Sequence, residues 1–329
     1  MRIVANTLSL APGSGIDTYA LQISRQLAAR GHELHVLAQR DGELRDDWAA
    51  FAAGVTVCGD FFHPPIGPPH LRRPAALAAW LGALARAVAA GRRCDPAVVF
   101  ANDAQLLPWA VACAGSRPVV CHLHNQLGGQ SLGRQRRFMA NRVDRFVVPS
   151  EFLRDDWVRA GLPAGQVAVV RQPLDLSSFP VATPASRAAA RRPLRIAPSA
   201  FVVAFVGRLV VDKGVDVLLD AWRRLDLAPE AGRLVLMGQV WPPDYADRLV
   251  RRADPDRCLL LAPGRDVVPL LHADDVVVLP SLWPEAGPRV LLEAMATGCP
   301  FSPRPPGLAP RCSPASWRAP SSHPVTSRP

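Results

Sequence analysis

Lysine is almost absent from this 329-residue chain: Lys213 is the only one among 38 basic residues, and the rest are arginine. Because lysine occurs only once, we ask what Lys213 does that arginine would not. The chain also lacks a run of about 18 uncharged apolar residues, so no membrane-spanning helix is predicted. The nearest approach, residues 74–90, is rich in alanine and interrupted by Arg86. We interpret it as a helix packed within a domain, with a membrane-surface helix as the alternative.

The seven cysteines include no C-x-x-C pair and no cysteine at ligand spacing from a histidine. The sequence therefore predicts neither a disulfide framework nor a zinc site, and free thiols are typical of a reducing compartment. The opening residues, MRIVANTL, turn polar at once, so no signal peptide is predicted. These features indicate a cytoplasmic protein.

The net charge is +10, from 38 basic and 28 acidic residues. Basic residues gather at 133–145 without interleaved aromatic side chains, so a nucleic-acid partner is not expected. A solvated helix face is the simplest interpretation of this cluster. The alternatives are an anionic membrane surface, which would make the protein peripheral to the inner face of the membrane, or an acceptor that carries phosphate.

Short apolar, β-branched runs alternate with helical patterns along most of the chain, which predicts parallel sheets covered by helices. The fold class expected is α/β, with two tandem doubly wound, Rossmann-like domains. We place the first domain at residues 1–173, a linker at 174–199 and the second domain at 200–300. The predicted strands are RIVANTL, ELHVLAQ, GVTVCG, PAVVFAN, RPVVCHLH, RFVVPS, VAVVRQP, AFVVAFVGRL, LVLMG, CLLLAPG and DDVVVLPS.

Residues 301–329 have a different character, with eight Pro and six Ser and no Asp, Glu or Lys. Proline at this density removes ladder donors and breaks helices, so we expect no strand or helix there. Our hypothesis is a disordered tail translated out of frame, with a genuine disordered tail as the alternative. A doubly wound domain that stops one helix after its fourth strand is expected to be incomplete.

A cluster of candidate binding residues follows the first strand of the second domain: Gly207, Arg208, Lys213 and Gly214. Arg208 is expected at the end of that strand and Lys213 at the start of the next helix. Two cations beside a helix N-terminus suit an anion, most naturally a diphosphate. Lysine has a compact charge where arginine has a planar fork, so a crowded phosphate site explains the single lysine.

Two carboxylates form the second candidate constellation. Glu285 follows the predicted strand DDVVVLPS, and Glu293 comes eight residues later on the next helix. At about 1.5 Å of rise per residue they would stand roughly 12 Å apart. Each carboxylate can accept hydrogen bonds from two sugar hydroxyls. The alternative is a helix with one capping and one solvated glutamate.

These motifs in this order resemble retaining glycosyltransferases of family 4, which have the GT-B fold. The resemblance rests on GRLVVDKG and, about 70 residues later, E-x7-E within PSLWPEAGPRVLLEAMATGCP. It extends over residues 1–300 through LSLAPGSGIDTYALQISRQLAARGHELHVLA, CHLHNQ, VVPSEF and RQPLDLSSF.

The resemblance implies a role for each matching residue. Arg208 and Lys213 would hold the diphosphate of a nucleotide-sugar, with Gly207 allowing close approach. Glu285 would bind the donor sugar and Glu293 the ribose.

In the amino-terminal half, Gly13 and Gly15 would offer backbone donors to the donor phosphate, and His124 would contact the sugar near the reacting carbon. His122 is equally eligible by position, and a core histidine is the alternative for His124. The family transfers sugar with retention of configuration to glycan or lipid-linked acceptors. It implies no metal and no cofactor beyond the donor.

Two departures from the family pattern affect these expectations. Where the family has E-x-F-G, this chain has Ala286, Gly287 and Pro288 after Glu285, and Pro288 lacks an N–H that could face the donor. The family's last strands and final helix are also missing from the pattern. We therefore expect low solubility or no activity from the chain as it stands.

Three other functions compete with a family-4 transferase, and a metal-dependent transferase of the other glycosyltransferase fold is a further alternative. A dinucleotide oxidoreductase is disfavoured because Thr18 stands where the third glycine of G-x-G-x-x-G would fall. The D-x-D at residues 254–256 precedes a strand and contains Pro255, so it predicts a turn and not a metal site. A sugar-nucleotide epimerase and an inactive remnant that at most binds nucleotide stay open.

Overall fold

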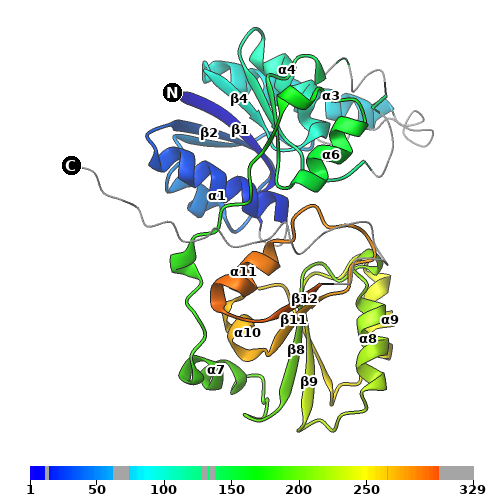
Figure 1. The fold of residues 1–329 in the computed structure, drawn as a ribbon. Helices are drawn as coiled ribbons and strands as arrows, with labels where there is room; N and C mark the ends of the chain where they lie inside the picture. The colour runs from blue at the N-terminus through cyan, green and yellow to red at the C-terminus, as the bar shows by residue number, and fades with distance from the viewer. Residues whose placement is uncertain are drawn as a thin grey trace. The chain divides into compact units, whose positions relative to one another are not determined.

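The structure is a computed structural model that describes residues 1–11, 15–61, 74–127, 132–133, 138, 140–264 and 266–303. It divides into two compact units: Met1–Ser178 with Pro263–Asp266, and Phe179–Ala262 with the residues from Val267 onward. Each unit contains one parallel sheet flanked by helices (Figure 1). The predicted α/β class with two doubly wound domains is confirmed, and all the predicted strands form.

The first unit has a seven-stranded sheet in the order β3-β2-β1-β4-β5-β6-β7. Its strands are β1 (Arg2–Ser9), β2 (Glu33–Arg40), β3 (Gly54–Val57), β4 (Val98–Ala101), β5 (Val119–His122), β6 (Arg145–Val148) and β7 (Val167–Val169). Its helices are α1 (Gly15–Ala29), α2 (Arg45–Ala49), α3 (Pro74–Arg93), α4 (Leu107–Ala114) and α6 (Glu151–Arg159), with short 3-10 turns η1 (Ala104–Leu106), η2 (Ala164–Gln166) and η3 (Leu176–Ser178).

The second unit has a five-stranded parallel sheet in the order β10-β9-β8-β11-β12. Its strands are β8 (Phe201–Val206), β9 (Gly232–Met237), β10 (Cys258–Leu261), β11 (Val276–Leu279) and β12 (Phe301–Pro303). Its helices are α7 (Pro184–Arg191), α8 (Val215–Arg224), α9 (Asp244–Arg252), α10 (Val268–Ala273) and α11 (Arg289–Thr297), with the 3-10 turn η4 (Val211–Lys213).

The apolar stripe of α8 explains how this helix attaches to the second sheet. Val215, Leu218, Leu219 and Trp222 follow helical spacing and are buried. Leu225, the next apolar residue at that spacing, is 58% exposed. It lies one residue beyond the helix, so it leaves the buried face.

The alanine-rich segment forms α3, which packs against α4. Ala83 and Ala87 are buried, and a Cβ on Gly91 would lie 2.5 Å from Cys113 Sγ, so the two helices approach closely. This agrees with a helix packed within a domain. Within the part of the chain described, no helix is both long and apolar enough to cross a membrane.

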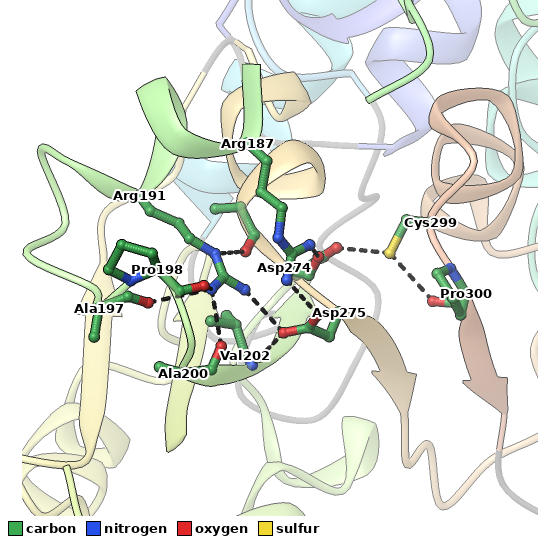
Figure 2. Close-up of polar contacts among 11 residues, drawn as sticks. Arg187, Arg191, Ala197, Pro198, Ala200, Val202, Asp274, Asp275, Cys299 and Pro300 are labelled. Atoms are coloured by element: carbon green, nitrogen blue, oxygen red, sulfur yellow. Dashed lines mark hydrogen bonds and ion pairs between the residues drawn. The ribbon is translucent and has the colours of Figure 1, made fainter. Parts of the chain in front are cut away.

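The structure differs from our expectation of an irregular linker over 174–199. Residues from Phe179 onward belong to the second unit, and α7 lies within the range. The buried Arg191 guanidinium donates to the carbonyls of Ala273, Ala197, Pro198 and Ala200 at 2.7–3.2 Å and to Asp275 at 2.8 Å (Figure 2). Arg187 on the next turn back also pairs with Asp275. This network attaches α7 to the start of β11.

The expectation of no strand beyond Pro300 is wrong for three residues. Phe301–Pro303 form β12, with Phe301 opposite Val277 on β11, and Phe301 packs against the core of the second unit. Parallel pairing at a sheet edge and partial burial of an aromatic ring outweigh the unfavourable composition. The remainder of the expected tail, residues 304–329, and three of the five arginines of the basic cluster at 133–145 lie outside the described residues.

Candidate functional site

Two glycines bring the carboxyl ends of β8 and β9 together. The Gly207 N–H donates to the Met237 carbonyl across 3.0 Å. A Cβ on Gly238 would lie 1.8 Å from the Gly207 carbonyl oxygen, and Gly238 has φ +153°, so only glycine fits there. Arg208 follows directly with an exposed side chain. The fold thus presents an arginine at the carboxyl edge of the second sheet, where ligands of such sheets bind.

The turn that carries the single lysine packs against the loop after β11 through backbone contacts. Gly214 has φ +70°, and a Cβ there would lie 2.1 Å from the Pro280 carbonyl oxygen. The Leu282 N–H donates to the Asp212 carbonyl across 2.8 Å. These contacts fix η4 against the segment that leads to Glu285.

Lys213 and Glu285 form an ion pair in this corner of the second unit. Lys213 Nζ lies 2.5 Å from Glu285 Oε1, and the side chains are 27% and 20% exposed. The Ser281 hydroxyl donates to the same carboxylate oxygen. Two of the predicted site residues, 72 positions apart in sequence, therefore meet at the carboxyl ends of neighbouring strands.

Glu293 is not part of this pair. Its carboxylate accepts a hydrogen bond from Arg289 Nε across 2.6 Å, one turn earlier on α11, and the residue is 7% exposed. Burial raises the pKa of Glu293, and the Arg289 charge opposes that rise. Our spacing estimate for Glu285 and Glu293 assumed helix throughout, but α11 begins only at Arg289. The rise per residue therefore does not give the separation of the two carboxylates.

His124 belongs to the first unit, just after β5, in a cluster with Asn102, His122 and Tyr19. Its Nε2 lies 3.0 Å from Asn102 Oδ1 and 2.7 Å from His122 Nδ1. Tyr19 stacks on the His122 ring with centroids 4.1 Å apart. Burial lowers the pKa of His124 to about 3, so the imidazole is neutral at physiological pH.

Hydrogen bonds hold the polar groups of this cluster around His124. Asn102 Nδ2 donates to the Ile16 carbonyl, so Oδ1 faces His124. Asn102 Oδ1 and His122 Nδ1 both lie within hydrogen-bond distance of the same atom, His124 Nε2. His122 is fully buried, whereas His124 is partly exposed, which favours His124 as the residue that meets a ligand.

A cavity of about 240 Å³ opens beside His124. Its lining includes Asp103, Gln105, Asn125, Leu127 and Trp157. Trp157 is held by a hydrogen bond from Nε1 to the Asn125 carbonyl at 3.0 Å. Carboxylate and amide groups beside an aromatic side chain are suited to a ligand with several hydroxyls.

The predicted glycine-rich loop is described only in part. Gly13 lies outside the described residues, and Gly15 is the first residue of α1. A Cβ on Gly15 would meet nothing within 4 Å, so space is open at this position. The first turn of α1 is attached to β1 by the buried Asp17, whose Oδ1 accepts from the Thr7 hydroxyl at 2.6 Å and the Leu8 N–H at 2.8 Å.

The sequence did not identify Arg289, Asn102 or Trp157. A cation four residues before the second glutamate of E-x7-E was a usable signal for Arg289 (four residues place them on one helix face). Within the described ranges, no group of three His, Cys, Asp or Glu side chains could hold a metal ion. Asp254 instead caps a turn before β10 by accepting from the Asp256 N–H at 3.0 Å, as predicted for the D-x-D segment.

Several solved structures have a similar fold. Anabaena HepE, crystallised in complex with UDP and glucose, superposes with a TM-score of 0.74 at 22% identity, over 92% of this chain and 80% of that one. Sucrose-phosphate synthase from Thermosynechococcus elongatus gives a TM-score of 0.71 at 18% identity, over 92% and 81%. These likenesses establish the GT-B fold.

Sequence comparison finds similarity to glycosyltransferases. The D-inositol 3-phosphate glycosyltransferase of Mycolicibacterium gilvum is 28% identical over 87% of this chain and 68% of its own length. The Salmonella typhimurium lipopolysaccharide 1,2-N-acetylglucosaminetransferase is 27% identical over 62% and 53%.

Two family models match consecutive parts of the chain. The model described as Glycosyl transferases group 1 matches residues 200–301, within the second unit. The model described as Glycosyltransferase Family 4 matches residues 13–178, which is half of the chain. The protein belongs to glycosyltransferase family 4.

Proposed function

We propose that this glycosyltransferase takes its sugar from a nucleotide-diphosphate donor, with a UDP-sugar as the first candidate. The observation that carries the proposal is the Lys213–Glu285 pair at the carboxyl edge of the second sheet, with Arg208 exposed on the same edge. The UDP and UDP-glucose complexes of Anabaena HepE, which has a similar fold, support it.

The chemistry of the pair suits transfer of a sugar from a diphosphate. On donor binding Lys213 would exchange part of its contact with Glu285 for a phosphate oxygen, and Glu285 would accept hydrogen bonds from sugar hydroxyls. Arg208 adds a second charge that stabilises the departing diphosphate. A lysine head group fits between the Glu285 carboxylate and a phosphate more compactly than a guanidinium, which is our explanation for the single lysine.

The remaining roles follow from the family resemblance and are part of the same proposal. Glu293 binds the ribose, His124 contacts the transferred sugar, and Gly13 and Gly15 donate to the donor phosphate. A neutral imidazole such as that of His124 has one ring nitrogen that can accept a hydroxyl hydrogen. Transfer proceeds with retention of configuration, without a metal, since the two cations carry the charge of the leaving group.

For the acceptor we propose a molecule with several adjacent hydroxyls, as in a glycan, a glycolipid headgroup or an inositol phosphate. The Asp103, Gln105 and Trp157 side chains around the first-unit cavity support this class. The inositol-phosphate activity named for the Mycolicibacterium gilvum relative also supports it. A cytoplasmic location with peripheral membrane contact, and cell-surface polysaccharide as the product, complete the proposal.

Calorimetric titration of the wild-type chain and Lys213→Ala with UDP and with uridine tests the donor assignment. Loss of one charge–phosphate contact should weaken UDP binding by at least tenfold and leave uridine unchanged. Arg224→Ala, an exposed change on α8, is the control. Equal UDP affinity of the wild type and Lys213→Ala would refute the assignment.

Product analysis then tests transfer itself. UDP-sugars incubated with and without inositol phosphates or glycans should give a new glycoside only when the acceptor is present, and its anomeric proton coupling reports retention. A changed nucleotide-sugar without acceptor would instead identify an epimerase. Nucleotide binding with no product in any mixture would identify an inactive relative.

A further inference from the structure

The start of α11 is unusual in its chemistry. Its N-cap residue is Pro288, which has no N–H and makes no side-chain cap. The first helical residue is Arg289, a cation at the positive end of the helix dipole, where acidic residues are favoured. Nothing in helix stability explains an arginine at this position.

The ion pair between Arg289 and Glu293 is likewise not explained by helix stability. Arginine before glutamate at i,i+4 is the less favourable order for a helix. Nevertheless Arg289 Nε lies 2.6 Å from Glu293 Oε1, and the two side chains are only 16% and 10% exposed. Helix stability therefore does not account for this buried ion pair, because its orientation along the helix is the unfavourable one.

The purpose suggested by the geometry concerns the state of Glu293. An ionised carboxylate accepts hydrogen bonds at both oxygens. In a protonated carboxyl, one oxygen carries the hydrogen and acts as a donor. Burial favours the protonated form, and Arg289 supplies the opposing charge and a directed N–H. Arg289 therefore decides whether Glu293 is an effective acceptor of vicinal hydroxyls.

We propose that Arg289 is a positioning residue for Glu293: its guanidinium holds the carboxylate ionised and oriented so that it discriminates nucleotides by their ribose hydroxyls. The inference rests on the proposed function in assigning the ribose to Glu293. It adds a residue that sequence motifs alone leave without a role, and it predicts that donor selectivity depends on an arginine that does not itself contact the donor.

The test compares UDP with 2′-deoxy-UDP by calorimetric titration. The wild type should prefer UDP, and Arg289→Met should reduce that preference about tenfold, which is about 1.4 kcal/mol. Arg289→Lys keeps the charge and should retain part of the preference. Arg224→Met is the control on an exposed helix face. Because both act on one interaction, Arg289→Met and Glu293→Gln should be non-additive.

Direct contact between Arg289 and the diphosphate gives a different result and would overturn the inference. In that case Arg289→Met weakens UDP and 2′-deoxy-UDP equally, leaves uridine unchanged and adds to Glu293→Gln.

A second measurement needs no nucleotide. Carboxyl carbon NMR should show that the pKa of Glu293 rises by at least about one unit in Arg289→Met, since a salt-bridge partner shifts a carboxyl by 1–3 units. An unchanged titration would overturn the inference even where nucleotide binding is normal. A wild-type chain that binds no nucleotide would overturn the proposed function and the ribose role together. The titration would still decide whether Arg289 keeps Glu293 ionised.

Discussion

Cys299 donates its thiol hydrogen to the Asp274 carboxylate across 2.6 Å, and both residues are buried (Figure 2). The neighbouring Asp275 takes the charged hydrogen bonds of Arg187 and Arg191. Asp274 thus pairs with a weak donor, and its Oδ2 has no hydrogen-bond partner among the described residues. Burial accordingly raises the pKa of Asp274 to about 7.

This carboxyl should make the second unit less stable at high pH. An unfolded aspartate has a pKa of about 3.9, so the folded state holds the proton more tightly. The stabilisation is complete below about pH 4 and is lost as the pH rises through about 7. Urea unfolding of wild type and Asp274→Asn at pH 5 and pH 8 checks this. The difference between them should change by about 3 kcal/mol from pH 5 to pH 8, at about 1.36 kcal/mol for each of about two pH units below the folded pKa, and the exposed Asp256→Asn should keep the wild-type slope.

Arg191→Met should destabilise the second unit by roughly 3–5 kcal/mol, because it leaves Asp275 and four backbone carbonyls with fewer partners in a buried site. Chemical unfolding measures the loss. Arg192→Met, an exposed neighbour, should change stability by less than about 0.5 kcal/mol. Equal effects of the two changes would show that the guanidinium network is not stabilising.

Gly214→Ala should displace η4 from the loop after β11, since the new methyl group would lie 2.1 Å from the Pro280 carbonyl oxygen at a φ of +70°. We expect a loss of at least about 1–3 kcal/mol in stability and weaker UDP binding through Lys213. Gly165→Ala is the matched control, because a Cβ there meets nothing within 4 Å. If Gly214→Ala binds UDP as tightly as the wild type does, the position of η4 does not affect the donor site.

His124 should not titrate between pH 5 and 8, since burial lowers its pKa to about 3. As a neutral buried base it stabilises the fold above about pH 6.5, and this contribution is lost as the pH falls toward 3. Asn102→Asp places a carboxylate about 3.0 Å from Nε2 and should raise that pKa by at least about one unit. Imidazole proton NMR follows both states. Asn141→Asp, an exposed change at a residue that does not line the cavity, should have little effect, and a wild-type His124 that titrates near pH 6.5 would contradict the prediction.

The sequence predicted the sheets because buried parallel strands, such as β8 and β11, have short runs of β-branched and other apolar residues. It also placed Lys213 and Glu285 each after a parallel strand of one sheet, and the carboxyl ends of such strands share an edge. Neither inference needs side-chain packing.

The features that were missed depend on tertiary contacts. Arg191 is buried although arginine is ordinarily exposed, and only its five acceptors in the folded chain make that favourable. In β12 the pairing with β11 and the packing of the partly buried Phe301 against the core override a composition unfavourable to strands. The pairing of Arg289 with Glu293 follows from where α11 begins, and helix boundaries are poorly determined by sequence patterns.

The ion pair between Lys213 and Glu285 gives the chain a natural chemical reporter. Lys213 bears the only lysine amine in the sequence, and its side chain is 27% exposed beside the Glu285 carboxylate. An amine-specific acylating reagent therefore has one side-chain target, and a protease that cuts after lysine has one cleavage site. Protection of that single atom would report occupancy of the proposed donor site without any engineered label.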